Sequence, residues 1–81
     1  MRPTSALMTY ELDATGLLCP LPVLKARKRL QALAAGEQLR MRADDPAAVI
    51  DVPHFCAQSG HLLVESTQEG NVQIYVIEKS A

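Results

Sequence analysis

The sequence contains little of what several classes of protein require. Its 81 residues include no tryptophan, one phenylalanine and two tyrosines, whereas proteins that bind single-stranded nucleic acid stack the bases on aromatic side chains. Eight basic and nine acidic residues give a net charge of -1, so bulk charge predicts no attraction to nucleic acid or to an anionic membrane surface. Direct RNA binding is therefore disfavoured, and an anionic partner would have to be attracted by a local basic patch.

Cysteines and long apolar runs are also scarce. Two cysteines are too few for the disulfide framework of a small secreted domain. No stretch approaches the roughly 20 apolar residues of a membrane span, and the first nine residues, with Arg2, Pro3 and Thr4, lack the apolar segment of an export signal. We therefore expect a cytoplasmic protein with reduced thiols and no membrane partner.

The remaining composition is that of one small folded domain. Apolar residues make up 48% of the chain and charged residues 21%, which is typical of a globular protein. A chain of this length buries about 60% of the surface that it exposes when unfolded, which is enough for a modest core. We expect residues 1–6 to be a flexible lead-in and residues 7–81 to form a single domain.

Hydrophobic periodicity predicts the first three elements. Residues 7–13 and residues 37–43 alternate between apolar and polar side chains, as half-buried strands do. Between them, residues 20–34 carry apolar side chains three and four positions apart, which indicates an amphipathic helix, and Gly36 is its expected end. The apolar stripe consists of Val23, Ala26, Leu30 and Leu33.

The second half of the chain predicts another helix and then a hairpin. Asp45 suits the residue that caps a helix, and Pro46 suits its first position. Pro53 is expected to end or kink this helix at the preceding residue. Residues 61–68 and 72–79 are predicted strands, and the short segment between them favours a tight turn.

The order of these elements predicts the fold. Strand-helix-strand units favour right-handed parallel connections, and a tight turn joins antiparallel strands. The order βαβαββ therefore predicts an α/β fold of the α+β two-layer sandwich type, in which a four-stranded mixed sheet has both helices packed on one face. The other face is expected to be open and partly apolar, so it offers a surface for a partner. Its expected members are Arg40, Arg42, Leu63, Glu65, Tyr75 and Ile77.

The two cysteines differ in their surroundings. On a helical wheel, Cys56 falls with Val49, Val52 and Phe55 on the apolar side of the second helix, so we expect a packed and unreactive thiol. Cys19 lies at the start of the first helix, where the positive end of the helix dipole favours a thiolate.

Two prolines frame the start of the first helix. Pro20 biases Cys19 toward extended geometry, so that the thiol projects from the helix start, and Pro22 restricts the residue before it in the same way. Both prolines lack the N–H group with which a first turn stabilises an anion. We therefore expect an exposed thiol that is held in a fixed direction and is only modestly activated.

A single exposed thiol restricts the possible chemistry. A C-x-x-C oxidoreductase needs a second cysteine where this chain has Pro22. A cysteine hydrolase needs a base beside the thiol, and the sequence gives no reason to place His54 or His61 there. A zinc site made of these histidines and Cys56 is disfavoured because His54 and Cys56 point to different sides of the helix, so we expect no metal. What remains is a thiol that holds a group covalently and hands it on, for example as a persulfide.

Several motifs occur in order along the chain. L-D-A-T-G-L-L-C-P-L-P at residues 12–22 contains a C-P-x-P motif, and D-D-P-A at residues 44–47 and D-x-P-x-F-C at residues 51–56 follow it. With these motifs, the chain resembles the TusA/SirA-like sulfur-carrier family over about residues 10–79.

The resemblance implies a function as well as a two-layer α/β sandwich. It implies a sulfurtransferase in which Cys19 accepts sulfane sulfur from a cysteine desulfurase or a rhodanese-like donor. The persulfide then passes to a downstream acceptor protein, with no cofactor besides the covalent persulfide itself. In the best-known members the destination is the 2-thio group of wobble uridine in tRNA, and related members feed molybdenum-cofactor assembly or cytoplasmic sulfur oxidation. The tRNA branch commonly has an acidic residue where this chain has Leu21, which leaves the pathway open.

Other residues near the thiol are candidates for supporting roles. Gly16 marks the turn before the thiol, and Asp13 either caps that turn or contacts a partner. Lys25, Arg27 and Lys28 follow in the helix. They form either an ordinary solvated face or a positive collar that attracts an acidic donor and stabilises the persulfide.

The alternative function is a non-catalytic regulatory module for protein interaction. In that case the open sheet face and the basic helix bind a partner, and the cysteine is incidental. For both functions we expect a monomer that binds its partners transiently.

Overall fold

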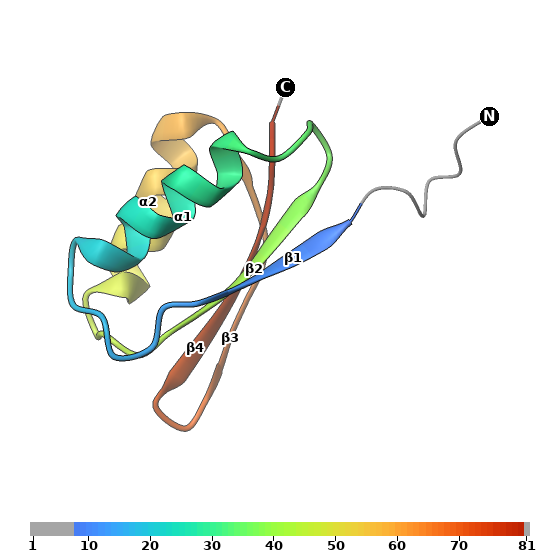
Figure 1. Cartoon of the computed structure of the whole chain (residues 1–81). Coiled ribbons are helices and arrows are strands. Elements are labelled where there is room, and N and C mark those ends of the chain that lie inside the picture. Colours follow the sequence, from blue (N-terminus) through green and yellow to red (C-terminus); the bar gives the residue numbers. More distant parts are fainter. Residues whose placement is uncertain (1–7, 81) are drawn as a thin grey trace.

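The computed structural model describes residues 8–80 and consists of one sheet with two helices on one of its faces (Figure 1). The elements are β1 (Thr9–Asp13), α1 (Leu21–Gln31), β2 (Gln38–Ala43), α2 (Ala48–Ser59), β3 (Leu62–Glu69) and β4 (Val72–Glu78). This is the predicted order βαβαββ. The expected lead-in of residues 1–6 lies outside the described residues, as do Leu7 and Ala81.

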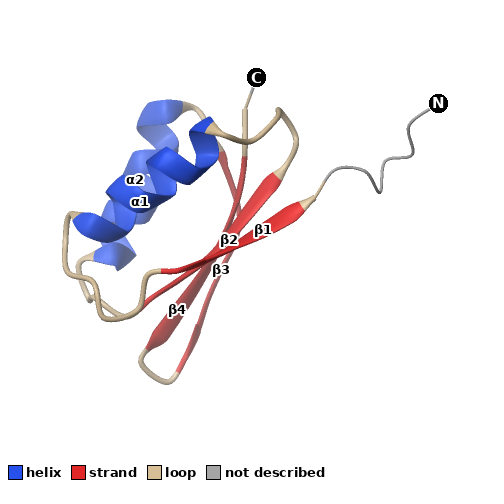
Figure 2. Ribbon diagram, viewed as in Figure 1, coloured by secondary structure: helices blue, strands red, loops and turns tan. Residues whose placement is uncertain are grey.

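The sheet has the strand order β1-β2-β4-β3. β1 and β2 are parallel and connected by α1, whereas β4 runs antiparallel to both β2 and β3. Figure 2 shows both helices on the same side of the sheet, which confirms the predicted mixed sheet with a single covered face. Because β1 and β2 are parallel neighbours, the loops that leave their carboxyl ends lie at the same edge of the sheet.

The core lies between the helices and the sheet. α1 contributes Ala26 and Leu30, which are buried because apolar side chains three and four positions apart share one helix face. Val23 and Leu33, the other members of the predicted stripe, are partly buried and pack against this core. Fully buried side chains from the sheet and α2 include Leu39, Met41, Val52 and Ile77.

The expectation that Tyr75 and Ile77 lie on the open face is wrong. Their side chains are 2% and 0% exposed and belong to the core beneath the helices. In the sheet they pair with Met41 and Leu39, which point to the same side. Leu63, which pairs with Ile77, also packs against this core instead of lying on the open face.

The error arises because β4 lies inside the sheet and is apolar on both faces. Ile74 and Val76 are buried as well, although they lie on the face away from the helices, where they pair with Arg42 and Arg40. A strand buried on both sides is a continuous apolar run, so its sequence does not show which residues face the helices. Arg40, Arg42 and Glu65 do lie on the open face, as predicted.

The predicted interruption of the second helix is also wrong, because α2 continues without a break through Pro53. The proline removes the N–H that would bond the carbonyl of Val49. The Val49 side chain is 51% exposed, so this turn of the helix faces solvent. Val52 and Phe55 are buried on either side of the proline and hold both halves of the helix against the core.

The helix boundaries differ from the predicted ones by a few residues. α2 begins at Ala48 instead of Pro46, and α1 ends at Gln31. Gly36, with a φ of 90°, belongs to the loop that follows α1, and its N–H donates to the carbonyl of Lys79 at 2.9 Å. Neither helix within residues 8–80 is long and apolar enough to cross a membrane.

Candidate functional site

Cys19 is exposed, as predicted, in the loop between β1 and α1. α1 begins at Leu21, with Pro20 at its cap position and Pro22 in its first turn, and the peptide bond between Cys19 and Pro20 is cis. The thiol lines an open cleft of about 210 Å³ between the two helices. The other residues that line this cleft, called the thiol cleft below, are Pro20, Val23, Arg27, Asp51, His54, Phe55 and Gln58.

Three aspartates hold the loop that carries the thiol. Asp44 accepts a hydrogen bond from the N–H of Gly16 at 2.9 Å, and Asp45 accepts one from the N–H of Cys19 at 2.5 Å. Asp51, in the first turn of α2, accepts a third from Sγ of Cys19 at 2.8 Å. The backbone and the sulfur of Cys19 are therefore both fixed by carboxylates from the following loop and helix.

The roles of these aspartates were not predicted from the sequence, although they lie in the D-D-P-A and D-x-P-x-F-C motifs. Asp45 and Asp51 are 26 and 32 residues from the cysteine that they contact. The available signal was topological. The two loops follow the carboxyl ends of adjacent parallel strands and therefore meet at one edge of the sheet, where functional groups of α/β folds gather.

Asp13 caps the turn that leads to the thiol. Its Oδ1 accepts hydrogen bonds from the backbone N–H of Thr15 at 3.0 Å and from the Thr15 hydroxyl at 2.6 Å. These bonds favour the charged carboxylate and lower the pKa of Asp13 below its ordinary value. Of the two roles that the sequence left open, the structure therefore shows the cap.

The expected activation of the thiol is wrong for the protein on its own. The pKa of Cys19 is raised, chiefly because its hydrogen bond to Asp51 favours the protonated form and also because of desolvation and the charges of Asp51 and Asp45. In the first turn of α1, the N–H of Leu21 is already bonded to the carbonyl of Leu18. The two nearby carboxylates therefore favour the protonated form of the thiol.

The structure separates the three basic residues of the predicted collar. Arg27 lines the thiol cleft, and its guanidinium lies 5.6 Å from the centroid of the Phe55 ring, a distance typical of a cation–π contact. Lys25 and Lys28 instead line a different depression, together with Leu12 and Arg29. Only Arg27 therefore shares a cleft with the thiol.

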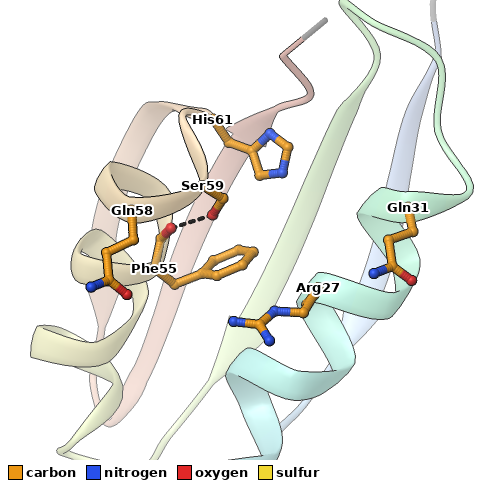
Figure 3. A pocket seen from close by; sticks show the side chains of 6 residues that line it. All are labelled: Arg27, Gln31, Phe55, Gln58, Ser59 and His61. Carbon is orange, nitrogen blue, oxygen red and sulfur yellow. Dashed lines mark hydrogen bonds between the residues drawn. The ribbon is translucent and has the colours of Figure 1, made fainter.

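A second hollow of about 580 Å³ adjoins the thiol cleft, because Arg27, Phe55 and Gln58 line both (Figure 3). His61 lines the second hollow, with its ring 5.9 Å from that of Phe55 and its Nδ1 accepting the N–H of Ser80 at 3.1 Å. His54, by contrast, lines the thiol cleft itself, a position that the sequence gave no reason to expect. The sulfur nevertheless bonds to a carboxylate and not to either histidine.

Cys56 is buried, as predicted. Its side chain is 2% exposed, and burial raises the pKa of its thiol to about 11, so it stays protonated and inaccessible. Within residues 8–80, no group of three or more histidine, cysteine, aspartate or glutamate side chains is placed to hold a metal ion.

Comparisons with known proteins agree with this architecture. A family model described as Sulfurtransferase TusA matches residues 10–79. Proteins named Sulfur carrier protein TusA from Allochromatium vinosum and Pseudomonas paraeruginosa are 47% and 44% identical over 70 residues, covering 86% of this chain and 92% and 89% of theirs. The crystal structure of a SirA-like protein from Desulfitobacterium hafniense superposes with a TM-score of 0.75 at 25% identity, covering 91% of this chain and 99% of the other. The chain therefore belongs to the TusA sulfurtransferase family.

Proposed function

We propose that this protein is a sulfur carrier in which Cys19 takes up sulfane sulfur as a persulfide and hands it to an acceptor protein. Membership of the TusA family supports the carrier role. The observation that carries the assignment to Cys19 is its placement. It is an exposed thiol at the mouth of a cleft, held at its backbone by Asp45 and at its sulfur by Asp51.

The proposed loading step is a transfer of sulfur between two thiols. The thiolate of Cys19 attacks the terminal sulfur of a persulfide on the donor, which forms a new S–S bond and breaks the donor's S–S bond. The donor sulfur leaves with the electron pair as a thiolate, so no external oxidant or reductant is consumed. Release is the same step in reverse: a nucleophile of the acceptor takes the terminal sulfur, and Cys19 leaves as the thiolate.

The second cysteine supports a carrier rather than a redox enzyme. A nearby accessible thiolate would attack the inner sulfur of the persulfide, which forms a disulfide within the chain, breaks the S–S bond of the persulfide and releases hydrosulfide. Cys56 is buried, and its thiol is kept protonated by its raised pKa. The persulfide on Cys19 therefore survives until a partner protein arrives.

The partners proposed for this reaction are a cysteine desulfurase or rhodanese-like donor and a downstream acceptor protein. Arg27 is positioned to stabilise an anionic sulfur because it lines the same cleft as Cys19. We assign Lys25 and Lys28, which lie outside this cleft, to longer-range attraction of an acidic partner. The carrier is proposed to act as a monomer in the cytoplasm, and no cofactor is needed for either transfer.

Sulfur loading tests this proposal directly. The purified protein is incubated with a cysteine desulfurase and cysteine, and its intact mass is measured without reductant. The expected result is a gain of one sulfur atom in the parent chain and in Cys56→Ser, and no gain in Cys19→Ser. A gain that persists in Cys19→Ser and disappears in Cys56→Ser would overturn the assignment.

The destination of the sulfur is a separate part of the proposal. The candidates are 2-thiolation of wobble uridine in tRNA, molybdenum-cofactor assembly and sulfur oxidation. A deletion strain is complemented with the parent chain or with Cys19→Ser, and three products are measured: 2-thiouridine in tRNA, the activity of a molybdoenzyme and the products of sulfur oxidation. Loss of one product that only the parent restores identifies the pathway. Full rescue by Cys19→Ser would instead favour the non-catalytic interaction module.

A further inference from the structure

The sulfur of Cys19 is held by one specific hydrogen bond. Its Sγ lies 2.8 Å from Oδ2 of Asp51, which is short for a thiol, a weak donor. Asp51 is partly buried in the first turn of α2, where the helix dipole favours a negative charge, and the neighbouring Val52 is fully buried in the core. The carboxylate that receives the S–H group is therefore held at the start of a helix that is packed against the core.

The charged and titratable groups around the thiol come from each element that surrounds it. α2 contributes Asp51 and His54, the loop before α2 contributes Asp45, and α1 contributes Arg27. Asp45 bonds the backbone N–H of Cys19 rather than its sulfur. Among these groups, Asp51 is the one that accepts a hydrogen bond from the sulfur itself.

We propose that Asp51 is a positioning residue that keeps the Cys19 sulfur protonated and directed toward α2 while no partner is bound. This inference deepens the proposed function. It rests on that function only for the purpose that it gives to the protonated Cys19 thiol. A protonated thiol is a poor nucleophile and is oxidised slowly, so the resting carrier is protected from reaction with oxidants and small electrophiles. Loading begins when the proton passes from this hydrogen bond to solvent and the sulfur attacks as the thiolate.

The interaction between a carboxylate and a sulfur atom depends on whether the sulfur is protonated. A carboxylate accepts the proton of a thiol in a hydrogen bond but repels the electron pair of a thiolate. Both effects favour the protonated form, in agreement with the raised pKa of Cys19. An asparagine at this position has no charge, and its amide N–H groups donate to a thiolate. Asp51→Asn should therefore favour the thiolate over the protonated thiol, whereas Asp51→Glu should keep the preference for the protonated thiol.

Alkylation of Cys19 by iodoacetamide tests this inference without any sulfur donor. The rate at Cys19 is measured by mass spectrometry from about pH 7.5 to 10.5, a range that spans the ordinary titration of a thiol. The variants are Asp51→Asn, Asp51→Glu and Asp45→Asn, the last as a matched control that removes a nearby carboxylate without touching the sulfur.

We expect Asp51→Asn to move the midpoint of the rate profile to lower pH. A shift of about one pH unit raises the rate near pH 7.5 about tenfold, since the rate follows the thiolate fraction. Asp51→Glu should retain a profile close to the parent's, and Asp45→Asn should shift it less than Asp51→Asn does. Asp51→Ser is measured alongside because serine is favoured near helix starts, so the test remains decisive if the asparagine variant does not fold.

The inference is overturned if the profiles of Asp51→Asn and Asp51→Ser match the parent's, or if Asp45→Asn shifts the midpoint as much. A failure of this kind would leave the sulfur-loading result untouched, because alkylation does not depend on sulfur transfer. Conversely, absence of sulfur loading on the parent chain would reject the proposed function while the alkylation profiles still reported the role of Asp51.

Discussion

Gln73 donates a hydrogen bond from Nε2 to the backbone carbonyl of Asp45 at 3.0 Å, and so joins β4 to the loop that holds Cys19. Gln73 is 4% exposed, and its Oε1 accepts the hydroxyl hydrogen of the buried Tyr75 at 2.7 Å. This polar connection runs from the core beneath the helices to the aspartate that binds the N–H of Cys19. The position of the thiol therefore depends on a buried amide that is remote from it in the sequence.

Replacing Gln73 with leucine should destabilise the protein. The change leaves the Tyr75 hydroxyl and the Asp45 carbonyl without their partner, and a buried unpaired polar group costs about 1–3 kcal/mol. Urea denaturation of Gln73→Leu should show a loss of this size in the free energy of unfolding. In the double variant with Tyr75→Phe, the loss of stability should be smaller than the sum of the two single losses. The reason is that the double variant no longer contains the Tyr75 hydroxyl that Gln73→Leu leaves without a partner. A Gln73→Leu variant as stable as the parent would contradict this account.

The sequence predicted the buried residues correctly where its apolar pattern fitted only one face of an element. The stripe Val23, Ala26, Leu30 and Leu33 predicted the buried face of α1 because the opposite face is charged. β4 has no such contrast between an apolar and a charged face, since Ile74 and Val76 are buried on one face and Tyr75 and Ile77 on the other. The inward-facing residues were therefore assigned wrongly, although the strand itself was predicted correctly.

The candidate site was predictable in part for a related reason. Local sequence was enough to place Cys19 as an exposed thiol before a helix, because prolines and helix starts act over a few residues. The electrostatics of the thiol depend on Asp45 and Asp51, which only the tertiary fold brings to it. An expectation based on the local helix dipole alone therefore had the wrong sign.

The two thiols should differ strongly in reactivity. Cys19 is exposed and Cys56 is buried, so a small alkylating reagent reaches only one of them in the folded protein. Native protein treated with iodoacetamide at about pH 8.5 should gain a single label, located on Cys19 by peptide mass analysis. The same treatment in denaturant should give two labels. Labelling of Cys56 at a comparable rate in the native protein would show that the helix pair opens.

Burial of Cys56 should make the protein less stable in alkaline solution. Its pKa is raised from the ordinary value of 9.0 to about 11 in the folded state. The unfolded chain therefore ionises first, so the stability is complete below about pH 9 and is lost as the pH rises toward about 11, by roughly 3 kcal/mol at most. Urea denaturation between pH 8 and 11 should show this decline in the parent.

Lysines and tyrosines also titrate in this alkaline range, so the comparison requires a variant without the buried thiol. Cys56→Ala is the matched control, because it removes the ionisable group and leaves the other groups unchanged. The difference between the two stability curves isolates Cys56. Parallel curves for the parent and Cys56→Ala would show that the buried thiol does not resist ionisation.

Arg27 should contribute more to sulfur loading than the other residues of the basic collar. Its guanidinium lies in the thiol cleft against Phe55, whereas Lys25 lines a separate depression. Arg27→Ala should slow loading by about fivefold at low salt, which corresponds to roughly 1 kcal/mol of charge interaction near a surface. Lys25→Ala should have a smaller effect, and both effects should weaken as salt is added.

Comparing two sulfur sources reveals how Arg27 acts. Loading from a protein donor depends on docking as well as on stabilisation of the anionic sulfur, whereas loading from inorganic polysulfide requires no docking. Slower loading of Arg27→Ala from both sources indicates that the guanidinium stabilises the sulfur on Cys19. Slower loading from the protein donor alone indicates a docking contact. If Lys25→Ala and Arg27→Ala are equally slow with polysulfide, sharing a cleft with the thiol gives Arg27 no special role.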